Sequence, residues 1–158
     1  MSPVSRRKKT KPVYLGGVQI GGEAPIVVQS MTSSDTRDVS ATVQQIRELE
    51  DVGCEIVRVA VPDETAAAAI HEIKDQIHIP LIADIHFSPQ LALLAMRHGA
   101  DGIRINPGNI LPDGIRKIVL YKKNENPPLL KNKRTLMIRD SLSCIDNPCC
   151  SAYLPRQQ

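Results

Sequence analysis

The stretch "DGIRINPGN", residues 101–109, decides how the fold is interpreted. Ile103 and Ile105 alternate with Arg104 and Asn106, which is the period of a β-strand, and a Pro-Gly pair then ends the strand. A strand that lies between helical segments is expected to be apolar on both faces. The arginine and the asparagine on one face therefore need an explanation.

Working outward from this strand, a unit of strand and helix recurs along the chain. Strands are predicted over residues 25–31, 55–61, 80–87 and 101–106. Helices are predicted over residues 39–53, 63–77 and 88–99, and residues 111–124 also fit a helix. A short hairpin is predicted before them, over residues 12–22, because two apolar pieces flank a Gly-Gly pair. Strands and helices that alternate with short connections form a parallel sheet with right-handed crossovers.

Polar residues gather on one face of the predicted strands, near their carboxyl ends. They are Gln29 or Ser30, Arg58, Asp84 with His86, and Arg104 with Asn106. In an open doubly wound sheet both faces carry helices, whereas one face of a (β/α) barrel is its lumen, with active sites at the carboxyl-end mouth. The pattern therefore predicts an α/β fold, a partial (β/α) barrel of about four βα units after a short hairpin, with an irregular C-terminal tail.

Two arginines facing one lumen require an anion, because an unpaired buried arginine is costly. An internal ion pair with Asp84 would explain Arg58 or Arg104, but we do not expect a single carboxylate to satisfy both. Guanidinium groups bind phosphate oxygens in a bidentate manner. The arrangement thus suggests a phosphate or diphosphate ligand, and a purely structural ion-pair network remains the alternative.

Composition narrows the function classes. The formal net charge is +3, and aromatic residues make up 3% of the chain. Because aromatic rings are so few, a nucleic-acid binder that stacks bases on them is not favoured. Arginines and lysines at positions 6–11 are expected to form a flexible basic tail. Since no long apolar stretch follows them, we predict no membrane anchor and a cytoplasmic location.

Four segments in unbroken order resemble a known family. They read "APIVVQSMT", "GCEIVRVAVP", "IPLIADIHF" and "GADGIRINPGNI", within a stretch from about Arg7 to Ile110. This stretch resembles the N-terminal part of the 4-hydroxy-3-methylbut-2-enyl diphosphate synthases, iron–sulfur enzymes of the non-mevalonate isoprenoid pathway in bacteria and plastids.

The resemblance implies a (β/α) barrel that binds 2-C-methyl-D-erythritol 2,4-cyclodiphosphate. It also implies a separate domain with a 4Fe–4S cluster held by three cysteines and a glutamate. The family opens the cyclic diphosphate and removes a hydroxyl group reductively, with electrons from flavodoxin or ferredoxin. By motif position, Arg58 and Arg104 should hold the diphosphate. The same mouth would be lined by Asp84, His86, Asn106 and Asn109.

Beyond Ile110 the resemblance fades, and from about Asn124 we find no further βα unit in the sequence. We therefore divide the chain into a basic tail (1–11), a partial barrel (12–123) and a non-homologous, poorly ordered tail (124–158). A complete barrel needs eight strands and about 250 residues. The chain is accordingly expected to be a truncated or frameshifted fragment that is inactive alone and lacks the cluster ligands.

The tail contains three of the four cysteines, Cys144, Cys149 and Cys150. Their spacing does not match the usual paired ligands, so no metal site is predicted there. Two other functions stay open: a barrel like that of dihydropteroate synthase, and a non-catalytic half-barrel that pairs with another chain, including a homodimer that completes eight strands.

Overall fold

The computed structural model describes residues 10–124 and 135–138 of the chain. Its strands are β1 (Val13–Leu15), β2 (Val18–Ile20), β3 (Gln29–Met31), β4 (Ile56–Ala60), β5 (Leu81–Ile85), β6 (Gly102–Ile105) and β7 (Thr135–Ile138). Its helices are α1 (Val39–Asp51), α2 (Glu64–Lys74), α3 (Pro89–Arg97) and α4 (Pro112–Asn124). From β3 onward, strand and helix alternate as the sequence predicted.

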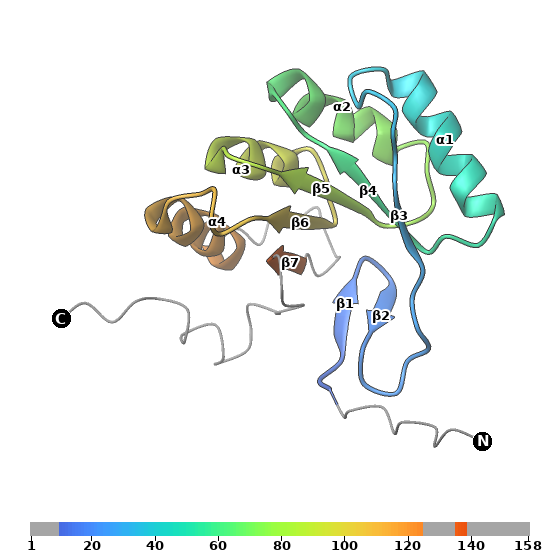
Figure 1. The fold of residues 1–158 in the computed structure, drawn as a ribbon, viewed down its shortest axis with the longest axis horizontal. Coiled ribbons are helices and arrows are strands. Elements are labelled where there is room, and N and C mark those ends of the chain that lie inside the picture. Colours follow the sequence, from blue (N-terminus) through green and yellow to red (C-terminus); the bar gives the residue numbers. More distant parts are fainter. Residues whose placement is uncertain (1–9, 125–134, 139–158) are drawn as a thin grey trace.

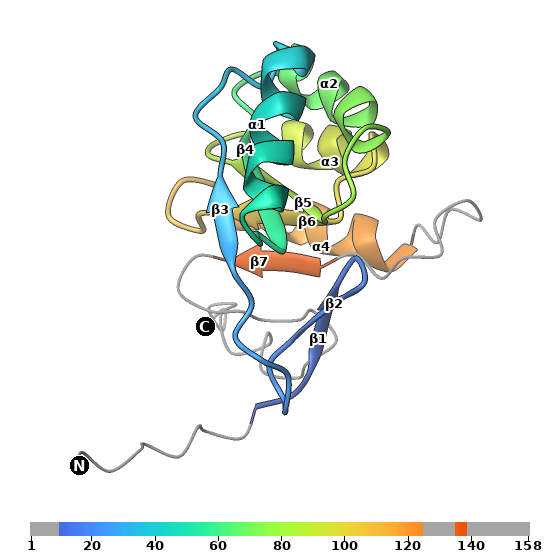
Figure 2. The same ribbon diagram turned by 90° about the vertical axis from the view of Figure 1, so that its right-hand side faces the viewer.

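The strands form two sheets (Figure 1). β1 and β2 make an antiparallel hairpin, and β3 to β7 make a parallel sheet in chain order. Figure 2 shows α1, α2 and α3 on one face of this sheet and the hairpin on the opposite side. Among the described residues, helices cover one face alone, which distinguishes a piece of a barrel from a doubly wound sheet. The prediction of a partial (β/α) barrel behind a short hairpin is confirmed.

The sheet has one strand more than the four predicted. β7 pairs in parallel with β6, with position 135 beside Gly102 and position 138 beside Ile105. No further βα unit was found in the sequence after Asn124, and this single strand was not predicted. The run "TLMI" is short and does not alternate between apolar and polar residues, so only its pairing with β6 identifies it as a strand. The other predicted tail residues, the cysteines among them, and the basic residues 6–9 lie outside the described residues.

The helices α1, α2 and α3 begin within one residue of their predicted starts and end two or three residues before their predicted ends. The side chains of Asp38, Asp63 and Ser88 accept a backbone N–H from the first turns of α1, α2 and α3. Gly53 and Gly99 follow α1 and α3 with φ of 88° and 99°, a conformation that favours glycine. In the part of the chain that the structure describes, no helix has the length and apolar character needed to cross a membrane.

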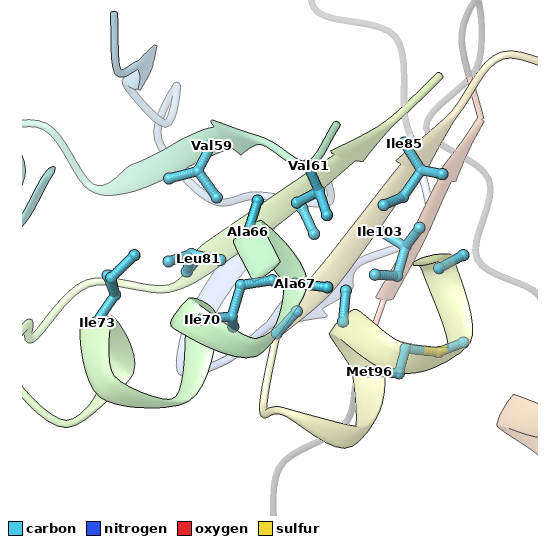
Figure 3. Packing of buried hydrophobic residues seen from close by; sticks show 14 of the residues in the cluster. Val59, Val61, Ala66, Ala67, Ile70, Ile73, Leu81, Ile85, Met96 and Ile103 are labelled. Atoms are coloured by element: carbon cyan, nitrogen blue, oxygen red, sulfur yellow. The ribbon is translucent and has the colours of Figure 1, made fainter. Parts of the chain in front are cut away.

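The helix-covered face of the sheet forms the main core (Figure 3). Val59, Leu81 and Ile103 project from three neighbouring strands and pack against Ile70 of α2 and Met96 of α3. Alternate residues of β4 and β5 supply this aliphatic layer, and each is buried. Burying each large aliphatic side chain contributes about 1.5–3 kcal/mol. This core fixes which residues of each strand face the helices and which face away.

The opposite face is apolar only toward the amino ends of the strands. There Leu15 of the hairpin packs against Ile56 and Ile82 in a small separate cluster. The hairpin thus covers the amino-end part of the inner face. Polar side chains begin two residues further along the same strands.

Candidate functional site

The strand register brings the polar residues of β4, β5 and β6 together. Asp84 lies between Ala60 and Arg104 in one row across the sheet, and Arg58 lies beside Ile82 in the preceding row. Side chains alternate along a strand, so Arg58, Asp84 and Arg104 share the face that points away from the helices. The two arginines converge, as the sequence predicted.

Asp84 is the centre of this cluster. Its side chain is 2% exposed, and both of its carboxylate oxygens accept hydrogen bonds from Nη1 of Arg104, at 2.7 and 2.9 Å. Nε of Arg58 lies 3.3 Å from Oδ2 of the same carboxylate. We call these three residues the Arg–Asp–Arg cluster.

The expectation that a single carboxylate would not satisfy both arginines was wrong in geometry. A carboxylate offers about four acceptor directions, so Asp84 can contact both guanidinium groups at once. The charge is nevertheless unbalanced, because two cations share one anion and the cluster keeps one net positive charge. The side chains of Arg58 and Arg104 are 28% and 22% exposed, so this charge is partly accessible to solvent.

The guanidinium groups keep donors available. Among the described residues, Nε and Nη2 of Arg104 and Nη1 of Arg58 make no hydrogen bond. The remaining N–H groups of Arg58, on Nε and Nη2, both point to Sδ of Met31 at 3.3 Å. Met31 was missed by the sequence interpretation, because a methionine on a strand usually signals packing. Donors beside a net positive charge are the chemistry that an anionic ligand requires.

The other predicted site residues do not join this cluster. His86 is exposed just after β5, with its ring 6.0 Å from that of Phe87. Oδ1 of Asn106 accepts the N–H of Gly108 at 3.2 Å, and its backbone oxygen accepts the N–H of Asn109 at 3.0 Å. These residues lie at the correct edge of the sheet, but in the described contacts the asparagines shape the loop after β6.

A second charged group stands at the same edge of the sheet. Arg37 binds Asp35 in its own loop and Asp63 at the start of α2. Its guanidinium hydrogen bonds hold the pKa of Asp35 at about 2, below the ordinary value of 3.8. The neighbouring carboxylate in turn raises the pKa of Arg37. This group joins the loop after β3 to the N-terminus of α2, and only the sequence "DTRD" hints at it.

The residues described do not fit the iron–sulfur cluster that the resemblance implies. Within residues 10–124 and 135–138, no three His, Cys, Asp or Glu side chains are grouped so that they could hold a metal ion. Cys54 is buried, and its thiol donates to the backbone oxygen of Ile56 at 3.1 Å. We therefore assign no chemical step to an iron–sulfur cluster at the described residues.

Comparison with known proteins identifies the domain family of the chain. The model of the GcpE TIM-barrel domain matches residues 10–130, which extends past Ile110, where the sequence resemblance was judged to fade. The chain is 54% identical over 125 residues to a 4-hydroxy-3-methylbut-2-en-1-yl diphosphate synthase (flavodoxin) of Thermodesulfovibrio yellowstonii, covering 78% of this chain and 36% of that protein. It is 60% identical over 130 residues to the protein of the same name from Anoxybacillus flavithermus, covering 82% of this chain and 36% of the relative. The chain thus spans about a third of the length of the curated relatives it matches.

Solved structures support the fold alone. A dihydropteroate synthase of Xanthomonas albilineans, solved with 4-aminobenzoic acid, matches with a TM-score of 0.55 and 18% identity. The match covers 72% of this chain and 50% of that barrel. At this level of identity the match indicates a shared architecture and does not indicate a shared reaction.

Proposed function

The chain belongs to the GcpE TIM-barrel domain family, and we propose that the mouth of its partial barrel binds the diphosphate group of 2-C-methyl-D-erythritol 2,4-cyclodiphosphate. The whole-protein activity that we propose is that of a 4-hydroxy-3-methylbut-2-enyl diphosphate synthase, an oxidoreductase of isoprenoid biosynthesis. The relatives that carry this name are 54% and 60% identical to the chain over the domain.

One observation carries the binding proposal. Arg58 and Arg104 converge on a single buried carboxylate, which leaves the cluster with a net positive charge and unused donors. Arg–phosphate contacts are charge-assisted and frequently bidentate, which makes them strong and directional. A diphosphate at the mouth would supply the negative charge that Asp84 alone does not.

Each residue of the cluster has a distinct proposed role. Arg58 and Arg104 bind diphosphate oxygens, while Asp84 holds the two guanidinium groups in place and keeps their mutual repulsion low. His86, Asn106 and Asn109 lie in loops at the same edge, and we assign them to the rim of the ligand site. Excluding water from this rim would strengthen the arginine–phosphate contacts.

The remaining parts of the reaction are proposed from the relatives. Reductive removal of a hydroxyl group needs an electron donor, and the relatives' names specify flavodoxin. A 4Fe–4S cluster would carry these electrons when bound, and its ligands are not among the described residues. We further propose a cytoplasmic location and a homodimer.

A binding experiment tests the proposal directly. Isothermal titration of the chain with inorganic pyrophosphate, and with the cyclic diphosphate, should give saturable binding. Binding should weaken about ten- to one-hundred-fold in Arg58→Gln and in Arg104→Gln, because each loses a charge-assisted contact. Arg47→Gln is the matched control, since Arg47 is exposed on α1, and its affinity should equal that of the wild type. If all three variants bind equally, or the wild type binds neither ligand, the site is not at this mouth.

A further inference from the structure

The hydrogen bonds of Arg58 divide its donors into two edges. The edge formed by Nε and Nη2 faces Sδ of Met31, which lies 3.3 Å from each nitrogen. Nε also lies 3.3 Å from Oδ2 of Asp84. On the edge formed by Nη1 and Nη2, Nη1 makes no hydrogen bond to the described residues. The Nε–Nη2 edge is therefore held by the protein, and Nη1 keeps its donors unused among the described residues.

Met31 lies beside Arg58 because of strand pairing. Position 31 of β3 is the register partner of position 58 of β4. The next residue, Thr32, donates its backbone N–H to the oxygen of Arg58 at 3.0 Å. These contacts fix the two backbones, so the sulfur reaches the guanidinium without loop movement.

The arginines are not held equally by Asp84. Arg104 makes two hydrogen bonds of 2.7 and 2.9 Å to the carboxylate, whereas Arg58 only approaches it at 3.3 Å. A long, partly exposed side chain held by one weak contact would sample several rotamers, and ordering it on binding costs affinity. Arg58 thus needs a second constraint, and the Met31 sulfur is the one that the structure provides.

We propose that Met31 is a positioning residue for Arg58: its thioether accepts the Nε and Nη2 hydrogens and so presents the Nη1–Nη2 edge to the diphosphate. This inference rests on the proposed function for its ligand, but the position of the guanidinium is a property of the protein alone. A thioether is a weak acceptor. It orients the arginine and leaves its positive charge in place, whereas a second carboxylate would neutralise that charge.

The test uses two substitutions at Met31 and one control. Met31→Leu keeps the apolar bulk and removes the acceptor, whereas Met31→Gln restores an acceptor of similar length. Met96→Leu makes the same chemical change in the buried core contact of α3 and reports the effect of losing a thioether elsewhere. Circular dichroism confirms that each 158-residue variant is folded.

The first readout needs no ligand. The Nε–H signal of Arg58 in a ¹⁵N correlation spectrum, assigned by its loss in Arg58→Lys, reports the contact with sulfur. In Met31→Leu its exchange with water should be about two- to five-fold faster, as expected when a weak hydrogen bond is removed. Met31→Gln should restore slow exchange, and Met96→Leu should leave it unchanged. An unchanged Arg58 signal in Met31→Leu overturns the proposal.

The second readout is the affinity for inorganic pyrophosphate. Met31→Leu should bind about two- to five-fold more weakly than the wild type, with Met31→Gln close to the wild type. If the wild type binds no pyrophosphate while the Arg58 signal responds to Met31→Leu, the proposed function fails and the positioning role stands. If the wild type binds and Met31→Leu binds equally well, the positioning role is refuted and the proposed function is unaffected.

Discussion

Replacing Asp84 by Asn tests the physical core of the site. The substitution keeps the shape of the side chain and removes the one negative charge between two guanidinium groups. Removing one partner of a buried ion pair costs about 3–5 kcal/mol, because the other charge stays behind unpaired. Arg58 and Arg104 are 28% and 22% exposed, so solvent screens part of that charge. We therefore expect a loss of about 2–3 kcal/mol in the free energy of unfolding.

The same substitution should have the opposite effect on anion binding. The cluster carries one net positive charge in the wild type and two in Asp84→Asn. An anion that binds the folded state alone raises the melting temperature, and at a fixed concentration the rise is larger when the anion binds more tightly. Pyrophosphate should consequently stabilise Asp84→Asn more than it stabilises the wild type, although the variant is the less stable protein without ligand.

Thermal unfolding at low ionic strength, with and without pyrophosphate, measures both effects. For a chain of this size about 2–3 kcal/mol corresponds to about 4–12 °C. Asp51→Asn is the matched control, because Asp51 is an exposed carboxylate at the end of α1. If Asp84→Asn melts together with the wild type, the carboxylate does not hold the arginines. If pyrophosphate stabilises both proteins equally, net charge does not attract the ligand.

Three further outcomes are expected. Burial alone would raise the pKa of Glu50, but hydrogen bonds from the backbone of His78 and its neighbour outweigh it and lower that pKa below 4.5. In urea unfolding at pH 7, Glu50→Gln should therefore lower the free energy of unfolding by about 1 kcal/mol. This difference from the wild type should shrink as the pH falls below the ordinary glutamate pKa, because the wild-type carboxylate then becomes protonated. Asp101→Asn should cost about 2–4 kcal/mol by the same measurement, because Asp101 is buried and holds both a lysine of α2 and a backbone N–H of β5. In Arg37→Ala the pKa of Asp35, followed by NMR titration, should rise from about 2 toward 3.8, and a pKa that stays near 2 would show that Arg37 is not its cause.

Periodicity was sufficient to predict most of the fold and the placement of the three clustered residues on one face of the sheet. The alternation of β4, β5 and β6 placed Arg58, Asp84 and Arg104 on one face, because parity along a strand is a local property. It did not predict that one carboxylate contacts both arginines. That result depends on the stagger between strands: Asp84 lies one row from Arg58 and in the same row as Arg104.

The features that the sequence did not predict depend on non-local pairing. Met31 has no polar signature, and its contact with Arg58 exists only because β3 and β4 pair in this register. β7 has a sequence too short for a periodic signal and is identified through β6. Asn106 was predicted at the mouth from strand parity, and parity did not predict that its side chain also accepts a backbone N–H in the following turn, which is common for asparagine.

The position of the site follows from how β5 divides its two faces. Leu81, Ala83 and Ile85 face the helices, and their burial fixes the parity of the strand. The alternate residues of β5 point to the opposite face: Ile82 packs under the hairpin, and Asp84 binds the two arginines. A shift of one residue would bury Asp84 among the helices and expose the aliphatic layer, at a cost far larger than the ion pairs contribute. The hydrophobic core therefore determines the face of the sheet on which the Arg–Asp–Arg cluster lies. Within that face, the contacts with Asp84 and Met31 hold the two guanidinium groups in position.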